Sequence, residues 1–156
     1  MTSYCDIDTL DRQILAELMN DSRKPFQEIA RNLCVSGGTI HVRVNRMREL
    51  GIITGSRLMV DHSLLGYDVT ALVGINLVNA GDYKKVIESV RKMDEVIEAH
   101  YTTGGYSLII KVIARSTRGL HWFLVEKLQP LKEIQSTETM ISLEMPIHRA
   151  IDPLME

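Results

Sequence analysis

The sequence from Ser36 to Leu50 reads SGGTIHVRVNRMREL and is the most informative segment of the N-terminal part of the chain. Written as a helix, it places Ile40, Val44 and Met47 on one stripe, at the i, i+4 and i+7 spacing of a buried face. Small, polar and cationic side chains then occupy the opposite side. An α-helix fits the DNA major groove, and small residues near its N-terminus let the backbone approach base edges. A surface helix with a solvated charged face is the alternative interpretation.

The flanking segments favour a helix-turn-helix module. The segment ahead carries apolar side chains at helical spacing behind Asp8, which is placed to cap a helix, with Asp11 in the first turn near the positive end of the helix dipole. Pro25 suits the start of a second short helix, and Ser36 is placed to cap the third. Gly51 follows the third helix as a C′ glycine. Three short helices in this order are typical of a DNA-binding domain.

Beyond these helices, the β-rich segment 52–60 is expected to form a small hairpin or wing. Charge is distributed unevenly along the chain. Segment 27–57 holds five arginines against two glutamates, whereas residues 61–156 carry an excess of acidic side chains. The whole chain has a net charge of −2, which does not favour general polyanion binding. The local arginine excess therefore suits a phosphate-facing surface on the first domain.

The residues expected to face DNA lie on the third helix and at its N-terminus. Arg43 and Arg46 are the strongest candidates, through phosphates or guanine edges. Arg43 lies close to the buried stripe, so phosphate contact, base readout and a structural ion pair are all open to it. Val42 can contact thymine methyl groups, and for the polar members plain solvent exposure is the alternative to reading base edges. The full candidate set is Ser36, Gly38, Thr39, His41, Val42, Arg43, Asn45 and Arg46.

From Gly66 onward the periodicity changes to that of a second, mixed domain. Strands are expected at 69–78, 96–102, 106–114 and 136–143, and helices at 82–93 and 117–128. The order β-α-β-β-α-β predicts a ferredoxin-like sandwich and makes the whole chain α+β. Right-handed crossovers put the first strand between the third and fourth, and the second at an edge. The sheet face without helices also alternates apolar residues, which predicts self-association.

A tight hairpin is expected at Thr103-Gly104-Gly105, between the second and third strands, where glycine supplies positive φ. This hairpin should lie at the end of the sheet where the second helix finishes and the fourth strand begins. The chain thus divides into a helix-turn-helix domain with its wing or linker at 1–60 and a ferredoxin-like domain at 61–156.

Composition excludes several classes. With 156 residues, 45% hydrophobic and 24% charged, the chain is typical of a soluble globular protein. It has no apolar run of membrane-spanning length and no signal peptide, so the cytoplasm is expected. Cys5 and Cys34 are expected to be reduced, Cys34 as a small buried residue at the helix-turn-helix corner, with a redox role as the alternative. No P-loop, nucleophile elbow or dinucleotide fingerprint indicates an enzyme. The histidines show no metal-ligand spacing: His41, His62, His100, His121 and His148.

The whole arrangement resembles the Lrp/AsnC family over roughly residues 6–150. The motifs that carry the resemblance are Asp8-x-x-Asp11-x-x-Ile14-Leu15, Ser36 to Arg46 followed by Leu50-Gly-Ile-Ile53, Tyr101-Thr-Thr-Gly-Gly-Tyr106 and Gln135-Ser-Thr-Glu-Thr139. The resemblance implies a bacterial or archaeal, nucleoid-associated transcription regulator with a ligand-sensing RAM domain. It also implies dimers that assemble further, commonly to octamers, and amino acids bound at contacts between dimers. Double-stranded DNA and an amino-acid effector are the implied partners, with no membrane, metal or other cofactor.

Within the family, the chain is most similar to the asparagine-responsive activator of asparagine synthetase expression, through segments 38–44, 98–104 and 133–139. This similarity implies L-asparagine as the effector. Clustered hydroxyls and a free backbone nest at the hairpin suit a zwitterion's carboxylate, although any hairpin can contain Gly-Gly. The implied effector residues are Ala99, Tyr101, Thr102, Thr103, Gly104, Gly105, Tyr106, Ser107, Gln135, Thr137 and Thr139. Segments 68–74 and 123–127 are further candidates for an effector held between subunits.

One residue departs from the family pattern. Many relatives place Asp where this chain has Ser107, and that carboxylate can receive the effector's ammonium group. A serine accepts a hydrogen bond but forms no ion pair. A ligand-indifferent architectural protein that wraps DNA is the alternative to an effector-controlled regulator.

Overall fold

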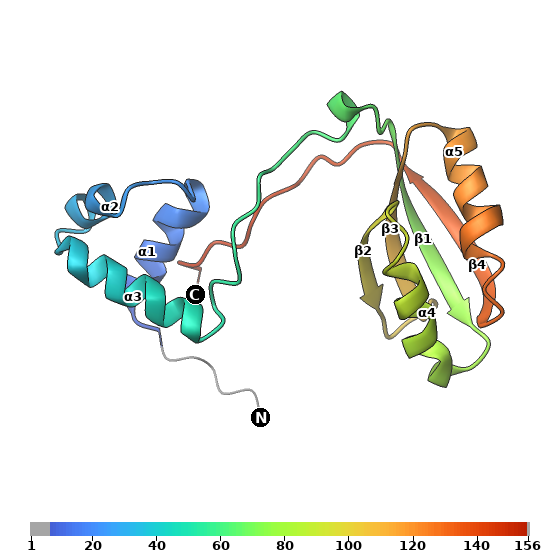
Figure 1. Cartoon of the computed structure of the whole chain (residues 1–156), viewed down its shortest axis with the longest axis horizontal. Helices are drawn as coiled ribbons and strands as arrows, with labels where there is room; N and C mark the ends of the chain where they lie inside the picture. Colours follow the sequence, from blue (N-terminus) through green and yellow to red (C-terminus); the bar gives the residue numbers. More distant parts are fainter. Residues whose placement is uncertain (1–6, 156) are drawn as a thin grey trace. The chain divides into compact units, whose positions relative to one another are not determined.

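The computed structural model describes residues 7–155, which form two compact units (Figure 1). The first unit contains residues up to Met59 together with the C-terminal segment from Ile147, and the second runs from Val60 to Pro146. Sequence analysis assigned the C-terminal segment to the second domain. That assignment is corrected because the segment contacts α1 (Thr9–Asn20), where Arg12 Nη1 donates to the carbonyl of Pro153 at 3.0 Å.

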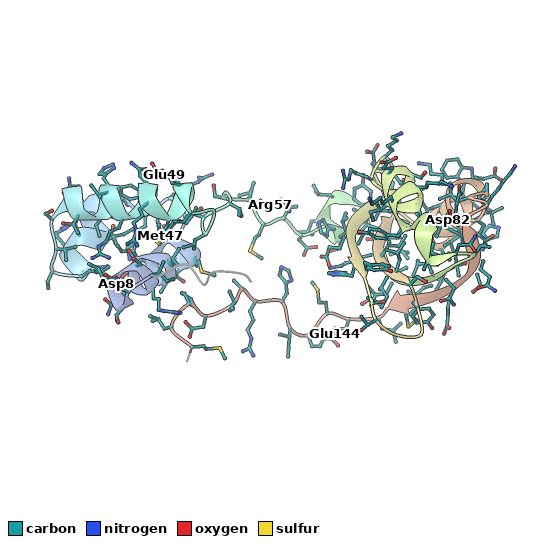
Figure 2. All side chains as sticks on the ribbon, turned by 90° about the horizontal axis from the view of Figure 1, so that it is seen from below. Asp8, Met47, Glu49, Arg57, Asp82 and Glu144 are labelled. Atoms are coloured by element: carbon teal, nitrogen blue, oxygen red, sulfur yellow. The ribbon has the colours of Figure 1, made fainter. Side chains whose placement is uncertain are left out.

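The first unit is the predicted set of three short helices. After α1 come α2 (Phe26–Asn32) and α3 (Gly37–Glu49). The predicted stripe of α3 is confirmed, with Ile40, Val44 and Met47 buried against Ile14 of α1 and Ile29 of α2. Figure 2 shows Met47 on the inner side of α3.

Caps fix where these helices begin and end. Asp8 caps α1 through a reciprocal capping box with Asp11, and the Ser36 hydroxyl caps α3 by accepting from the Thr39 N–H. Gly51, at φ 72°, ends α3 as predicted.

The predicted wing is absent from segment 52–60, which contains no strand. The N–H groups of Ile52 and Ile53 both bond to the Met47 carbonyl, closing the C-terminus of α3. Both side chains pack on the helical core. Helix capping therefore overrides β propensity here, and the rest of the segment forms neither a helix nor a strand.

The expectation for Cys34 was also wrong. Its side chain is exposed, and its backbone adopts φ 54° in the turn between α2 and α3. The tight turn needs one residue in the left-handed region, and this conformation directs the side chain outward. Cys5 lies outside the described residues.

The second unit is the predicted βαββαβ sandwich. Its four strands are β1 (Val69–Leu77), β2 (Val96–Tyr101), β3 (Leu108–Ala114) and β4 (Ile134–Ser142). The helical layer consists of η2 (Ala80–Asp82), α4 (Tyr83–Val90) and α5 (Thr117–Trp122), which continues as the π-helix η3 (Phe123–Leu128). A 3₁₀ turn, η1 (Ser63–Leu65), precedes β1. The antiparallel strand order is β2-β3-β1-β4, as predicted.

Both helices cover one face of this sheet (Figure 1) and bury its alternating side chains, including Val73 and Ile75. The opposite face remains open within a single chain. Leu72 of β1 and its register partner Met140 of β4 lie on it, 39% and 42% exposed. The expected apolar open face is therefore present. Among the described residues, the structure contains no helix with the length and apolarity to cross a membrane.

Candidate DNA interface and effector site

The outer face of α3 presents the predicted DNA-facing residues to solvent. Two of them, Thr39 and Arg43, are half-buried. Val42 is 69% exposed, which is unusual for an apolar residue in the middle of a helix. The exposed members are Ser36, Gly38, His41, Val42, Asn45 and Arg46.

Hydrogen bonds and ring contacts hold several of these side chains in place. The hydroxyls of Ser36 and Thr39 lie 2.8 Å apart, so the first turn of α3 carries a paired hydroxyl group. The imidazole of His41 packs edge-on against Phe26 of α2, with ring centroids 4.6 Å apart. In the C-terminal half of this face, the guanidinium of Arg48 donates to the side-chain oxygen of Asn45 at 3.3 Å.

Arg43 points toward α1. Its Nη1 lies 2.7 Å from Asp8 Oδ2 and 2.9 Å from Asp11 Oδ1. The hydrogen bonds that Arg43 donates to the carboxylates of Asp8 and Asp11 hold the pKa of its guanidinium above its ordinary value. Of the alternatives open to Arg43 from sequence, the structure contains the ion pair. Arg46 lies one turn further on and is 51% exposed, with Nη1 3.8 Å from Asp11 Oδ2.

The predicted hairpin is a loop of six residues, Thr102 to Ser107, between β2 and β3. Two hydrogen bonds close it: the Thr102 N–H donates to the Ser107 carbonyl at 3.1 Å, and the Thr102 hydroxyl donates to the Tyr106 carbonyl at 2.5 Å. Positive φ at Gly104 and Gly105 was wrongly predicted, because a six-residue loop closes without a two-residue tight turn. A Cβ added at either glycine would meet no atom of the described residues within 4 Å, apart from its chain neighbours.

Tyr106 leaves the loop and covers the open face of the sheet. Its ring lies against Gly74 of β1, and its phenol donates to Glu138 of β4 at 2.5 Å. The hydrogen bond to the Glu138 carboxylate raises the pKa of Tyr106 above its ordinary value. The hydroxyl of Ser107 accepts from the Leu77 N–H at 3.4 Å.

Other predicted effector residues lie on the helical side. Tyr101 contacts Tyr83 of α4, with ring centroids 4.4 Å apart. Ala99 lines a groove of about 340 Å³ between α4 and β2. Thr137 and Thr139 share their register with the buried Ile75 and Val73 of β1.

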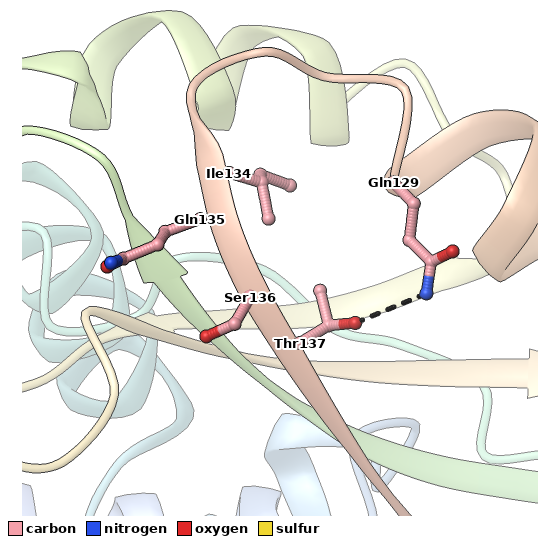
Figure 3. A pocket seen from close by; sticks show the side chains of 5 residues that line it. All are labelled: Gln129, Ile134, Gln135, Ser136 and Thr137. Carbon is pink, nitrogen blue, oxygen red and sulfur yellow. Dashed lines mark hydrogen bonds between the residues drawn. The ribbon is translucent and has the colours of Figure 1, made fainter.

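A second hollow, of about 240 Å³, lies where η3 ends and β4 begins (Figure 3). The residues that line it are Gln129, Ile134, Gln135, Ser136 and Thr137. Gln129 Nε2 lies 3.5 Å from the Thr137 hydroxyl, and Gln135 points away from this pair (Figure 3). The π-helix sets the place of Gln129, whose N–H donates to the Leu124 carbonyl.

The structure therefore brings Gln135 and Thr137 together at one hollow, and it places Tyr106 and Ala99 elsewhere. Sequence reasoning did not single out Glu138 or Gln129, and it included Gly74 only as the last residue of the candidate segment 68–74. The sequence indicated their roles only weakly. A glycine inside a strand suggests that another group packs closely against the backbone, and a glutamine at a helix end belongs to no motif.

Comparisons with known proteins agree with this architecture. Residues 7–48 match the AsnC-type helix-turn-helix domain, and residues 70–151 match the Lrp/AsnC ligand binding domain. The chain is 51% identical over 148 residues to the regulatory protein AsnC of Haemophilus influenzae, covering 95% of this chain and 99% of that protein. It is 50% identical to AsnC of Escherichia coli K12 over 147 residues, 94% of this chain and 97% of the relative.

Solved structures show the same fold. The structure of E. coli AsnC superposes with a TM-score of 0.91 at 49% identity, over 95% of this chain and 99% of the other. A transcriptional regulator from Neisseria meningitidis, solved as an L-Met complex, has a TM-score of 0.87 at 19% identity, over 92% and 94% of the two chains, and supports the fold alone. With both domains matched in order along nearly its whole length, this chain belongs to the Lrp/AsnC family of transcriptional regulators.

Proposed function

We propose that this protein reads a DNA sequence with α3 and changes its assembly or DNA affinity when L-asparagine binds to the second unit. The observation that carries the DNA half is the two-sided character of α3. Its apolar stripe is buried, while Val42, Asn45 and Arg46 are exposed together. Such a face supplies a methyl contact, an amide for adenine edges and a cation. We infer genes of amino-acid metabolism, asparagine synthetase among them, as targets, and a cytoplasmic, nucleoid-associated location.

The hollow beside Gln129 supports a neutral, amide-bearing effector. Its polar lining consists of two amides and two hydroxyls, without a charged side chain. A carboxamide both donates and accepts hydrogen bonds, so it is complementary to the Gln129 amide and the Thr137 hydroxyl. An aspartate side chain would bring a carboxylate into a lining without a cation, and its desolvation would be uncompensated.

We infer that the loop Thr102–Ser107 contacts the same ligand from the neighbouring end of the sheet. Ile75 of β1 pairs with Leu108 on one side and with Thr137 on the other. Adjacent strands lie about 4.8 Å apart, so the loop end and the hollow are about 10 Å apart. The open space at Gly104 and Gly105 supports a role in receiving the zwitterionic end of the ligand.

A second copy is needed to complete such a site. The hollow is shallow in one chain, and the effector candidates lie on both faces of the sheet. The open face with Leu72 and Met140 supports dimer formation, and the loop and hollow support contacts between dimers, up to an octamer. A ligand at such a contact regulates only if it binds one assembly more tightly than another.

Calorimetry of the purified full chain tests the effector. Saturable heat with L-asparagine, and weak or no heat with L-aspartate, is expected. Gln129→Leu should reduce this discrimination, whereas Lys132→Gln, an exposed change in the following turn, should leave it unaltered. No heat with any of the twenty amino acids would contradict the regulator hypothesis and favour a ligand-indifferent architectural protein. Light scattering with and without asparagine then measures the change of assembly.

A further inference from the structure

Asp11 has an unusual environment for an acid in the first turn of a surface helix. Among residues 7–155 it is the one polar or charged residue that is buried, at 1% exposure. An ionised carboxylate is stable in such a place only when cations and N–H donors surround it. Asp11 Oδ1 accepts from Arg43 at 2.9 Å, and Oδ2 accepts from the Asp8 N–H at 3.3 Å. The cation in contact with it comes from α3.

Arg43 joins this acid to a second one. The same Nη1 lies 2.7 and 2.8 Å from the two carboxylate oxygens of Asp8. Both acids belong to the first turn and cap of α1, where the capping box already fixes them. One guanidinium thus ties the middle of α3 to the start of α1 at a fixed distance and rotation.

This geometry gives different roles to Arg43 and Arg46, which the sequence presents as equivalent DNA-contact candidates. If Arg43 turned outward to a phosphate, the buried Asp11 would lose its nearest cation, which is strongly unfavourable. Arg46 is half-exposed and 3.8 Å from Asp11, so it can turn to a phosphate while Arg43 still neutralises the acid.

We propose that Arg43, with Asp8 and Asp11, is a positioning group that sets the orientation of α3 for reading bases, and that Arg46 is the arginine of this pair that contacts DNA phosphate. The inference rests on the proposed DNA-reading function. It differs from a purely structural ion pair, because the folded variant should lose sequence discrimination.

The salt dependence of DNA binding separates the two roles. The probes are a duplex of about 40 base pairs, selected by the full chain from a randomised pool, and a random duplex of the same length. For each variant, fluorescence anisotropy gives both affinities between about 50 and 200 mM salt. The slope of log K against log salt is negative, and each lost phosphate contact reduces its magnitude by about 0.9.

Arg43→Met should lower affinity for the selected duplex about tenfold, because misaligned base contacts weaken specific binding. The salt slope and the affinity for the random duplex should stay unchanged. Arg46→Met should weaken binding to both duplexes and lower the slope by about one unit per bound helix. Arg118→Met, an exposed arginine of α5, is the matched control and should change neither quantity.

A slope loss for Arg43→Met equal to that of Arg46→Met would overturn the proposal, as would an unchanged preference for the selected duplex in a folded variant. If Arg43→Met fails to fold, Asp8→Asn removes the exposed partner's charge and should lower the preference with the slope unchanged. An unaltered preference in Asp8→Asn would also overturn it. A wild-type chain that selects no sequence from the pool would instead contradict the proposed function.

Discussion

The ring of Tyr106 lies against the backbone of Gly74, so closely that a Cβ added to Gly74 would meet ring carbons at 2.6 to 2.8 Å. Only glycine allows this contact, because packed heavy atoms do not approach so closely. Gly74 lies in the central strand β1, paired with Ile109 and Glu138. The loop Thr102–Ser107, which carries several effector candidates, therefore packs on the sheet through Tyr106 because Gly74 has no side chain.

Gly74→Ala should lower the free energy of unfolding of the second unit by about 1–3 kcal/mol, because the ring must move or the strand must shift. The measurement is urea unfolding followed by fluorescence of Trp122, the only tryptophan, which lies in this unit. Gly81→Ala is the control, since its Cβ would meet nothing within 4 Å. In a chain that already carries Tyr106→Ala, Gly74→Ala should cost much less free energy of unfolding, because the clashing ring is gone. If the two changes lowered the free energy of unfolding additively, the contact between Tyr106 and Gly74 would be contradicted.

The phenol of Tyr106 should ionise above pH 10.0, its ordinary pKa. The hydrogen bond to Glu138 causes this shift, since the carboxylate accepts from the neutral phenol and repels the phenolate. The folded pKa is raised, so the stabilisation is complete below pH 10.0 and is lost as pH rises through the folded value. The difference between the ultraviolet titration curves of the wild type and of Tyr106→Phe isolates the ionisation of this phenol. Glu138→Gln should move its midpoint back toward the ordinary value, and an unmoved midpoint would rule the carboxylate out as the cause.

Sequence was sufficient for what periodicity and chain topology determine. The buried stripe of α3 follows from 3.6-residue spacing, and the strand order β2-β3-β1-β4 follows from right-handed crossovers. Ser36 and Gly51 were identified as helix ends because capping depends on local backbone chemistry.

What sequence missed depends on contacts between elements. From sequence alone, Arg43 is a cation on the flank of a DNA-facing helix. Its ion pairs with two acids exist only because α1 packs beside α3. Tyr106 is a loop residue without periodicity, and nothing local indicates that its ring crosses to Gly74. The wing was wrong for a related reason: the β propensity of Ile52 and Ile53 is real, but their N–H groups already serve the end of α3.

Ser36→Ala should lower the stability of the first unit by about 1 kcal/mol, because the Thr39 N–H loses its acceptor at 3.1 Å. Helical ellipticity during urea unfolding reports this loss. Ser116→Ala is a matched cap change in the second unit, where Ser116 accepts from the Gly119 N–H, and it should alter the Trp122 transition instead. An unshifted ellipticity transition for Ser36→Ala would show that the cap contributes little.

The stability of the first unit should fall in acid because of Asp8. Its hydrogen bonds from the Asp11 N–H and from Arg43 hold the pKa of this carboxyl below its ordinary 3.8. For an acid with a lowered folded pKa, the stabilisation is present above pH 3.8 and is lost as pH falls through the folded value. Asp8→Asn keeps an oxygen to accept from the Asp11 N–H but removes the charge that pairs with Arg43. The urea midpoint of this variant, followed by ellipticity, should therefore be lower than that of the wild type at neutral pH. The two midpoints should converge in acid. The Trp122 transition of the second unit should be the same in both chains. A constant difference between the two chains across this range would mean that the charge of Asp8 is not the source of the acid sensitivity.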